Sequence, residues 1–191
     1  MSLKRAAAKA LAEHLGRKVQ MLAGKTHSVS AEPEEIAAAP ALYVLPGKMT
    51  YESVQAVALD ETLGLLAAGY WVGTWELRLC HRTPHEREAL EAQVLQQFYG
   101  IEGAPGYIEL LLVPLLDGQP AQAAVACVFH VDGTEWNEEK SFDKKRFAYL
   151  DIEVELPHLV AEGALSYQVA ATLAAAVEDT DPDDAYALVI G

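Results

Sequence analysis

The chain has 191 residues, 51% of them hydrophobic, so it is long enough for one ordinary domain and apolar enough to bury a core. It carries 28 acidic and 14 basic residues, a formal net charge of −14, and such a surface repels nucleic-acid phosphates and anionic membranes. These numbers exclude wholesale disorder and argue against specific binding of DNA or RNA.

The cysteine content and the N-terminus indicate a cytoplasmic, soluble protein. Cys80 and Cys127 stand inside apolar, strand-like runs, and two buried thiols are usual in a reducing cytosol, although one bridge between neighbouring strands stays open as an alternative. His14, Arg17 and Lys18 interrupt the N-terminal segment, so we expect no signal peptide. No stretch approaches the roughly 18 apolar residues that a membrane helix needs.

The first third of the chain predicts a helix followed by short elements. Ser2 is a suitable N-cap for a helix to about Leu15, and Gly16 stands where a C-terminal glycine is common. The pattern then predicts a short strand, a short helix between two prolines, a strand that ends at a Pro-Gly turn, and a segment that fits a helix and a strand alike: 18–24, 30–39, 41–45 and 51–66.

The middle of the chain carries clearer local signals. Residues 70–80 predict a strand with Trp71 and Trp75 on one face, and we expect both rings in the core. The sequence Thr83-Pro84-His85-Glu86 predicts a helix start, because threonine caps the helix, proline suits its first position and the glutamate completes a capping box. Further on, Asp117-Gly118 predicts a hairpin turn between two strands.

The most regular segment is 147–156, where apolar and polar side chains alternate strictly. A period of two over this length predicts a strand that is buried on one face. The opposite face begins with two aromatic residues and continues with three carboxylates in a row, Asp151, Glu153 and Glu155. Like charges along one side of a strand repel each other, so we expect a partner to use this surface or solvent to cover it.

Two features before this strand are candidates for a contact between subunits or with a partner. The turn Lys144-Lys145-Arg146 is basic and leads directly into the acidic face, so the two together supply opposite charges for such a contact. Trp136 lies in a polar loop at 132–140, where no apolar pattern buries it. It is either the aromatic anchor of an interface or part of a loop that folds back and covers itself.

Together these elements predict an α+β fold with an antiparallel or mixed sheet flanked by two or three helices. We expect one domain at 1–156 and an extension at 157–191, packed on the same domain or on a neighbouring subunit. Within the extension, 178–184 is predicted as an acidic loop and 185–190 as a terminal strand.

Catalytic motifs are absent from the sequence. Cys80, His81 and His85 are the only cluster that resembles a metal site, and it would need a fourth ligand such as His130 or His158. Strong zinc signatures have paired ligand sets, so we interpret the histidines as polar residues around a helix start. The chain also lacks a phosphate-binding glycine loop and a Gly-x-Ser-x-Gly elbow. We therefore expect no enzyme, no cofactor and no metal ion.

Three stretches in this order resemble the Mu-like phage and prophage tail proteins of the tail-terminator or tail-completion type. They are 17–24 after the first helix, 34–45 as a short helix leading into a strand, and 142–156. Residues 70–98 also stand where that family has a strand followed by a helix. The resemblance covers roughly the first 156 residues, and 157–191 departs from the family pattern.

This resemblance implies a structural virion protein of the tail or neck, assembled in the host cytoplasm. Tail terminators form a ring, typically a homohexamer, that ends polymerisation of the tail tube and provides the joint to the neck. The expected partners are copies of the chain, the tube protein, a neck or head-completion protein and, in a contractile tail, the sheath protein. DNA is expected to pass through the lumen without specific binding, and no membrane is involved.

The alternatives of the same class are another small neck or tail-completion component and a part of a phage-derived contractile injection system. Two alternatives of other classes are a small-molecule binding module and a metal-dependent enzyme that uses the cluster at Cys80, His81 and His85.

Overall fold

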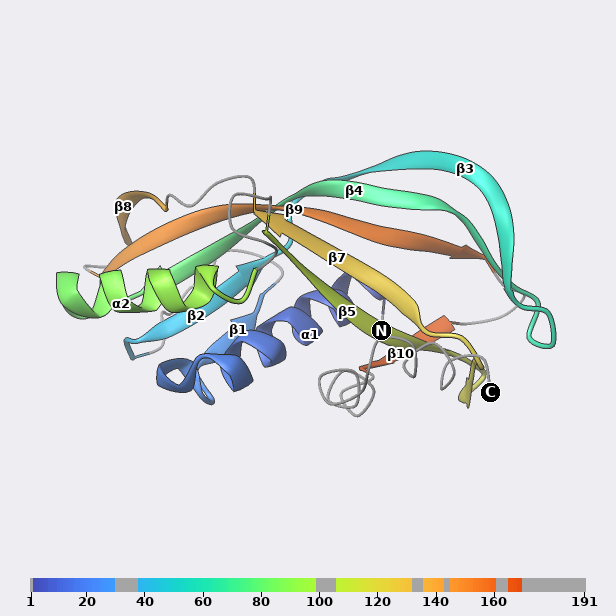
Figure 1. Cartoon of the computed structure of the whole chain (residues 1–191), viewed down its shortest axis with the longest axis horizontal. Coiled ribbons are helices and arrows are strands. Elements are labelled where there is room, and N and C mark those ends of the chain that lie inside the picture. The colour runs from blue at the N-terminus through green and yellow to red at the C-terminus, as the bar shows by residue number, and fades with distance from the viewer. Residues whose placement is uncertain are drawn as a thin grey trace.

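The sheet of this protein is strongly curled, and both helices pack against its concave face (Figure 1). The computed structural model of the chain describes residues 2–29, 38–98, 106–131, 136–142, 145–160 and 165–169. Over these residues the protein is α+β with a mixed sheet, which confirms the predicted class.

The helices are α1 (Leu3–Lys18) and α2 (Pro84–Leu95), with a single 3-10 turn η1 (Gln20–Leu22) after α1. The strands in chain order are β1 (Thr26–Ser28), β2 (Ala41–Leu45), β3 (Met49–Asp60), β4 (Leu65–Cys80), β5 (Gly106–Leu116), β6 (Gln119–Pro120), β7 (Val125–Val131), β8 (Asn137–Phe142), β9 (Lys145–Val160) and β10 (Leu165–Val169).

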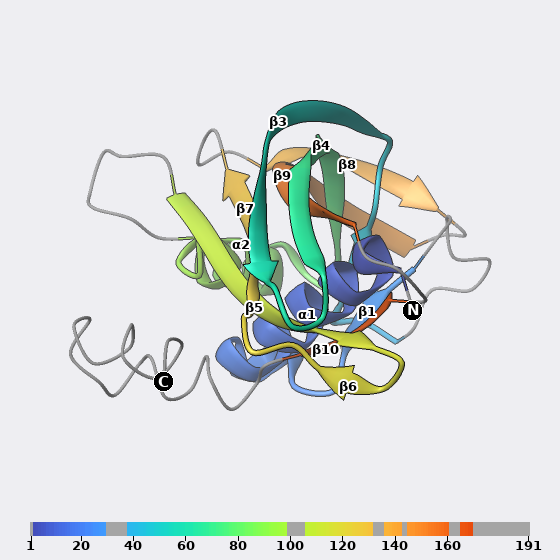
Figure 2. The ribbon, with the colours of Figure 1, turned by 90° about the vertical axis from the view of Figure 1, so that its right-hand side faces the viewer.

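The strands form one sheet in the order β1-β2-β4-β9-β7-β5-β10, with β3 beside β4, β6 beside β5 and β8 beside β9. The pair of β1 and β2 is parallel, and the other pairs are antiparallel. β4 and β9 form the long central pair, whose register runs from Leu66 opposite Val160 to Cys80 opposite Phe147. Seen from the side, the strands curve around α1 (Figure 2).

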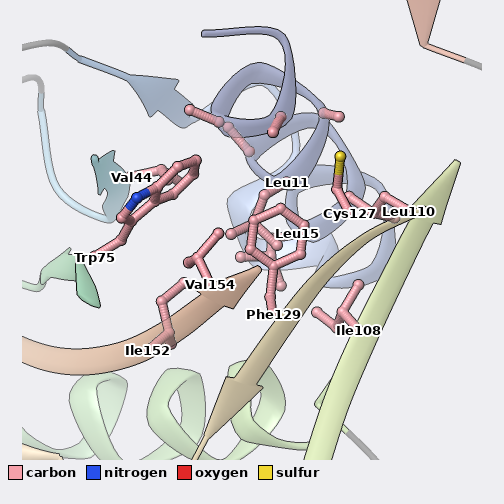
Figure 3. Packing of buried hydrophobic residues seen from close by; sticks show 14 of the residues in the cluster. Leu11, Leu15, Val44, Trp75, Ile108, Leu110, Cys127, Phe129, Ile152 and Val154 are labelled. Atoms are coloured by element: carbon pink, nitrogen blue, oxygen red, sulfur yellow. The ribbon is translucent and has the colours of Figure 1, made fainter. Parts of the chain in front are cut away.

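The core fills the concave face. Figure 3 shows side chains from β4, β5, β7 and β9 converging on Leu11 and Leu15 of α1. At its centre the rings of Trp75 and Phe129 meet edge to face, with centroids 5.8 Å apart. Strict alternation produces this face, because every second side chain of β9 from Ala148 to Leu156 is buried, as the sequence predicts.

Helix α1 begins as predicted and ends later than predicted. The side chain of Ser2 accepts a hydrogen bond from the backbone N–H of Arg5, and the helix continues to Lys18. Gly16 therefore lies inside the last turn and is buried there. An added Cβ on Gly16 would lie 2.6 Å from Oγ1 of Thr26 in β1, so the glycine allows the helix and the strand to approach closely.

The strand predicted at 18–24 is wrong. This segment contains the last residue of α1 and then η1, which buries Leu22 under the core. Backbone hydrogen bonds from Leu22 to Val19 and from Ala23 to Gln20 close the turn. The helix predicted at 30–39 lies outside the described residues, apart from its last two positions.

Two other local predictions are confirmed. Thr83 caps α2, since its Oγ1 accepts from the N–H of Glu86 at 3.1 Å, while the carboxylate of Glu86 accepts from the N–H of Arg82 at 2.6 Å. Asp117 and Gly118, with φ of 50° and 79°, form the turn between β5 and β6. Both values are positive, as a tight hairpin turn requires.

The ambiguous segment 51–66 is extended. It contains most of β3, a turn at 61–64 and the start of β4, and the β3–β4 hairpin arches over the body of the protein (Figures 1 and 2). We call this hairpin the arch. Leu65, at the tip end of β4, is fully buried in the core, so the arch returns to the body at its tip.

Asp60 fastens the tip of the arch. Its carboxylate accepts backbone hydrogen bonds from Thr62 at 3.0 Å and Leu63 at 3.1 Å, and from Gln122, before β7, at 2.9 Å. The hydrogen bond from Gln122, and then that from Leu63, hold the pKa of Asp60 below its usual value. The role of this residue was not predicted from the sequence, although Asp60-Glu61-Thr62 is a typical start of an Asx turn.

The predicted boundary between 156 and 157 falls inside β9, which continues to Val160. Leu165–Val169 form β10 and pair with β5, so this part of the extension belongs to the same sheet. Residues 161–164 and 170–191 lie outside the described residues, and with them the predictions for 178–184 and 185–190.

Candidate interaction surface

The acidic row of Asp151, Glu153 and Glu155 lies on the convex face of the sheet, opposite the helices. Asp151 and Glu153 are exposed and Glu155 is half-buried, while the residues between them are in the core. Because β9 lies between β4 and β7, the row runs along the middle of this face. The sequence predicted the exposed row, and the strand order gives it its central position.

The neighbours of the row form a shallow depression. Glu153 stands opposite Thr74 of β4 and His130 of β7, and Glu155 stands opposite Val72 and Val128. Thr74, His130, Glu153 and Glu155 help to line a shallow recess of about 340 Å³. Hydroxyl, imidazole and carboxylate groups here can accept hydrogen bonds from a cationic or polar partner.

Further carboxylates surround the row. Asp151 stands opposite Glu76, and Glu109 stands opposite Val128 on the same face. Arg78 forms an ion pair with Glu76, and its guanidinium lies 5.0 Å from the centre of the Phe147 ring. This arginine offsets one carboxylate, so the centre of the face keeps a negative charge.

The basic turn stands at the other end of the same strand. Lys144 lies outside the described residues, whereas Lys145 and Arg146 begin β9 opposite Phe142 and Ser141, with only their backbone described. Arg146 and Asp151 are five positions apart, about 16 Å along an extended strand. This spacing is too long for an ion pair within one copy, so a contact between the two features requires two copies.

Of the two interpretations of Trp136, the structure favours the packed one. The side chain is half-buried against the core, and its indole N–H donates to the backbone oxygen of Glu91 in α2 at 3.3 Å. Trp136 therefore fastens the segment before β8 to α2. The sequence could not show this, because the contact joins residues 45 positions apart.

Trp75 and Trp71 do not share one environment. Trp75 is in the core as predicted, but the prediction for Trp71 is wrong, since this ring is exposed. Ser2, Trp71 and His158 line a recess of about 390 Å³ at the start of α1, where the sheet passes beyond the helix. Trp71 packs against Tyr51 and His158 at centroid distances of 5.1 and 5.6 Å.

Phe147 differs from the prediction that placed it on the exposed face. It is buried in a small second cluster with Ala41, Tyr43 and Cys80. These residues stand on the strand positions that alternate with the main core, so this cluster lies on the convex side.

The two thiols lie in different clusters of the fold. Among the described residues, no three His, Cys, Asp or Glu side chains gather closely enough to hold a metal ion. Both cysteines are buried and neither is in a disulfide; Cys80 lies in the second cluster and Cys127 in the main core, so the sheet lies between them. Burial raises the pKa of Cys127 to about 12, which keeps this thiol protonated and unreactive at neutral pH.

A scan against models of known protein families finds no match to this chain, and a search of curated protein sequences finds none either. In the part of the chain that the structure describes, neither helix is long and apolar enough to cross a membrane.

Proposed function

We propose that this chain is a structural subunit of a phage-type tail, a tail terminator that forms a ring on the end of the tail tube. The ring would end polymerisation of the tube and provide the joint to the neck. The observation that supports this best is the acidic row of Asp151, Glu153 and Glu155 in the middle of the convex face. Three carboxylates along one strand are unfavourable in isolation, and a basic partner surface relieves their repulsion.

The closed ring explains where that basic surface comes from. A ring is built from heterologous contacts, so each subunit offers two different faces that complement each other. The Lys144-Lys145-Arg146 turn of one copy and the acidic row of the next copy supply the two charges. Within one copy they are too far apart to meet, as the 16 Å spacing along β9 implies.

The tube protein, the neck protein and, in a contractile tail, the sheath protein are the proposed further partners. An acidic lumen would let DNA pass without binding, by the same repulsion that disfavours nucleic-acid binding to the isolated chain. A strongly basic lumen in the assembled ring would contradict this part of the proposal.

The test is whether the protein forms rings and caps purified tail tubes, measured by native mass spectrometry and by electron microscopy of the tube ends. We expect caps on the tubes and no further growth of capped tubes when tube protein is added. A protein that neither binds tubes nor stops their growth would overturn the proposal.

Charge-reversal variants test the proposed contact. We expect reversal of the basic turn (Lys144, Lys145 and Arg146 to Glu) or of the acidic row (Asp151, Glu153 and Glu155 to Lys) to prevent ring formation. An equal mixture of the two variants should restore closed rings of alternating subunits, because each turn then meets a row of opposite charge, and both sets in one chain should restore rings as well. The matched control reverses the exposed ion pair of Lys9 and Glu13 on α1, whose charged atoms are 3.7 Å apart, and should assemble normally.

A further inference from the structure

The arch carries an exposed apolar surface that the proposed charge contact does not use. Nine large hydrophobic side chains are exposed among the described residues, and six of them belong to β3 and β4. They are Tyr51, Val54, Val57, Leu66, Tyr70 and Trp71. They lie on both faces of the hairpin, since Tyr70 and Trp71 are neighbours in β4 and point to opposite sides. Val54 and Val57 of β3 are the most exposed of the six, and the inference depends on these two.

The arch is also poor in charge. The part of the arch in which β3 pairs with β4, 49–73, contains Glu52, Asp60 and Glu61 and no lysine or arginine, so 3 of 25 residues are charged, about half the 22% of the whole chain. Asp60 is buried and already bonded to three backbone N–H groups. Two copies of a chain with a net charge of −14 repel each other over most of their surface, and the arch is where they can approach with few carboxylates between them.

One edge of the arch has open backbone groups. β3 pairs with β4 along one side, and none of the described strands pairs with its other side. At 12 residues it is long and contains no lysine or proline, and its register with β4 shifts between Ser53 and Val57 and between Ala58 and Asp60, so its regular stretch is 49–53. Such an edge can accept another strand through backbone hydrogen bonds.

The arch is held in shape before any partner arrives. Leu65 is buried in the core at the tip, and Asp60 joins the tip to Gln122. Because both ends of the hairpin are fixed to the body, a partner does not have to order it, and this lowers the entropic cost of binding.

We propose that the arch is a docking surface for a second copy of this chain, in which the partner covers Val54 and Val57 and adds a strand to the free edge of β3. This inference rests on the proposed function, since it names a contact that joins neighbouring copies. It uses other side chains than the charge contact between the basic turn and the acidic row, although Thr50 of β3 lines the recess beside Glu153 and Glu155.

Sedimentation equilibrium of the purified full-length chain over a wide range of concentrations tests the inference. The test variant carries Val54→Asp and Val57→Asp, because these side chains are 46% and 57% exposed and their loss should leave the fold intact. Each buried charge should weaken association about tenfold or more, so the dissociation constant should rise by about a hundredfold. The control is Met21→Asp, at an apolar side chain of 38% exposure outside the arch, and should associate as the original chain does.

Hydrogen exchange supplies a second measurement on the original chain. On self-association the backbone N–H groups of β3 should become protected, while those of α1 should not change. Circular dichroism and thermal melting of each variant confirm that it is folded.

The outcomes separate this inference from the proposed function. Equal association of the Val54→Asp/Val57→Asp variant and the original chain, or a chain that stays monomeric throughout, overturns the docking role of the arch, whether or not the protein caps tail tubes. Arch-dependent association of a protein that fails to cap tubes supports the arch and overturns the terminator function.

Discussion

The two tryptophans of β4 provide a direct test of where the core ends along this strand. Trp75 and Trp71 stand on the same side of the strand, but Trp75 is 1% exposed and Trp71 is 37% exposed. Trp75 packs against Phe129, and its indole N–H points to the sulfur of Met49 at 3.0 Å. Trp71 contacts Tyr51 and His158 at the open end of the core.

The burial of Trp75 sets the size of the effect. A buried tryptophan removes about 150–250 Å² from water, which at about 25 cal/mol per Å² corresponds to about 4–6 kcal/mol. An alanine at this position keeps part of the burial energy, because its methyl group stays in the core. Truncation of a large aromatic side chain in a core costs about 3–5 kcal/mol, so we expect Trp75→Ala to lower the free energy of unfolding by about 4 kcal/mol. Trp71→Ala should cost about 1–2 kcal/mol, because it loses two aromatic contacts and much of the ring is already in water.

Urea unfolding followed by far-ultraviolet circular dichroism measures both losses, since this signal does not depend on the deleted indole. Trp75→Ala removes a large share of the roughly 5–15 kcal/mol that stabilises a typical domain, so Trp75→Phe provides a milder point that should fall between the two alanine variants. Equal losses for Trp71→Ala and Trp75→Ala, or a loss below about 1.5 kcal/mol for Trp75→Ala, would refute the reasoning.

Two further predictions concern single contacts. Asp60→Asn should lower the melting temperature at neutral pH. The pKa of Asp60 in the folded protein lies below its value of about 3.9 in the unfolded chain. The stabilisation by the Asp60 carboxylate is therefore fully present above the unfolded pKa and is lost as the pH falls through the folded pKa. The difference in melting temperature between the original chain and Asp60→Asn should shrink from neutral to strongly acidic pH, and a difference that stays constant contradicts this. Gly16→Ala should destabilise the protein by about 1–3 kcal/mol in urea unfolding, although alanine favours helices, because the new methyl group meets Thr26. Thr26→Ala should restore most of this loss when combined with it, and simply additive losses would show that the two residues do not meet.

The elements that the sequence predicted well are those whose signal lies between neighbours in the chain. The alternation at 147–156 places side chains on two faces whatever the rest of the chain does. Thr83 and Glu86 stand one helical turn apart, and the turn at Asp117 and Gly118 needs positive φ at two adjacent residues. Each of these preferences is local, so each was readable without knowledge of the fold.

The features that escaped prediction depend on residues far apart in the sequence. Trp71 has the same strand parity as Trp75, and its exposure follows from where α1 begins under the sheet. The tie from Asp60 to Gln122 spans 62 positions. Gly16 was predicted to follow the end of the helix, because its close approach to Thr26 of β1 cannot be seen in the local sequence.

The candidate surfaces also combine features that are local in the sequence with features that depend on distant residues. The exposed acidic row was predicted because it follows from strand periodicity alone. Its place in the middle of the convex face depends on the strand order β4-β9-β7, which is not local. The arch was missed because 51–66 fits a helix and a strand alike, and only pairing of β3 with β4 decides between them.

The separation of Cys80 and Cys127 by the sheet gives this chain two internal reporters. Each thiol is shielded by a different cluster, so a thiol reagent reaches it only when that cluster opens. Denaturation uncovers both sulfurs together, whereas a partner that settles on the convex face slows the labelling of Cys80 and leaves that of Cys127 unchanged. Comparing the two labelling rates therefore distinguishes docking from a general gain in stability, with no dye or tag added to the protein.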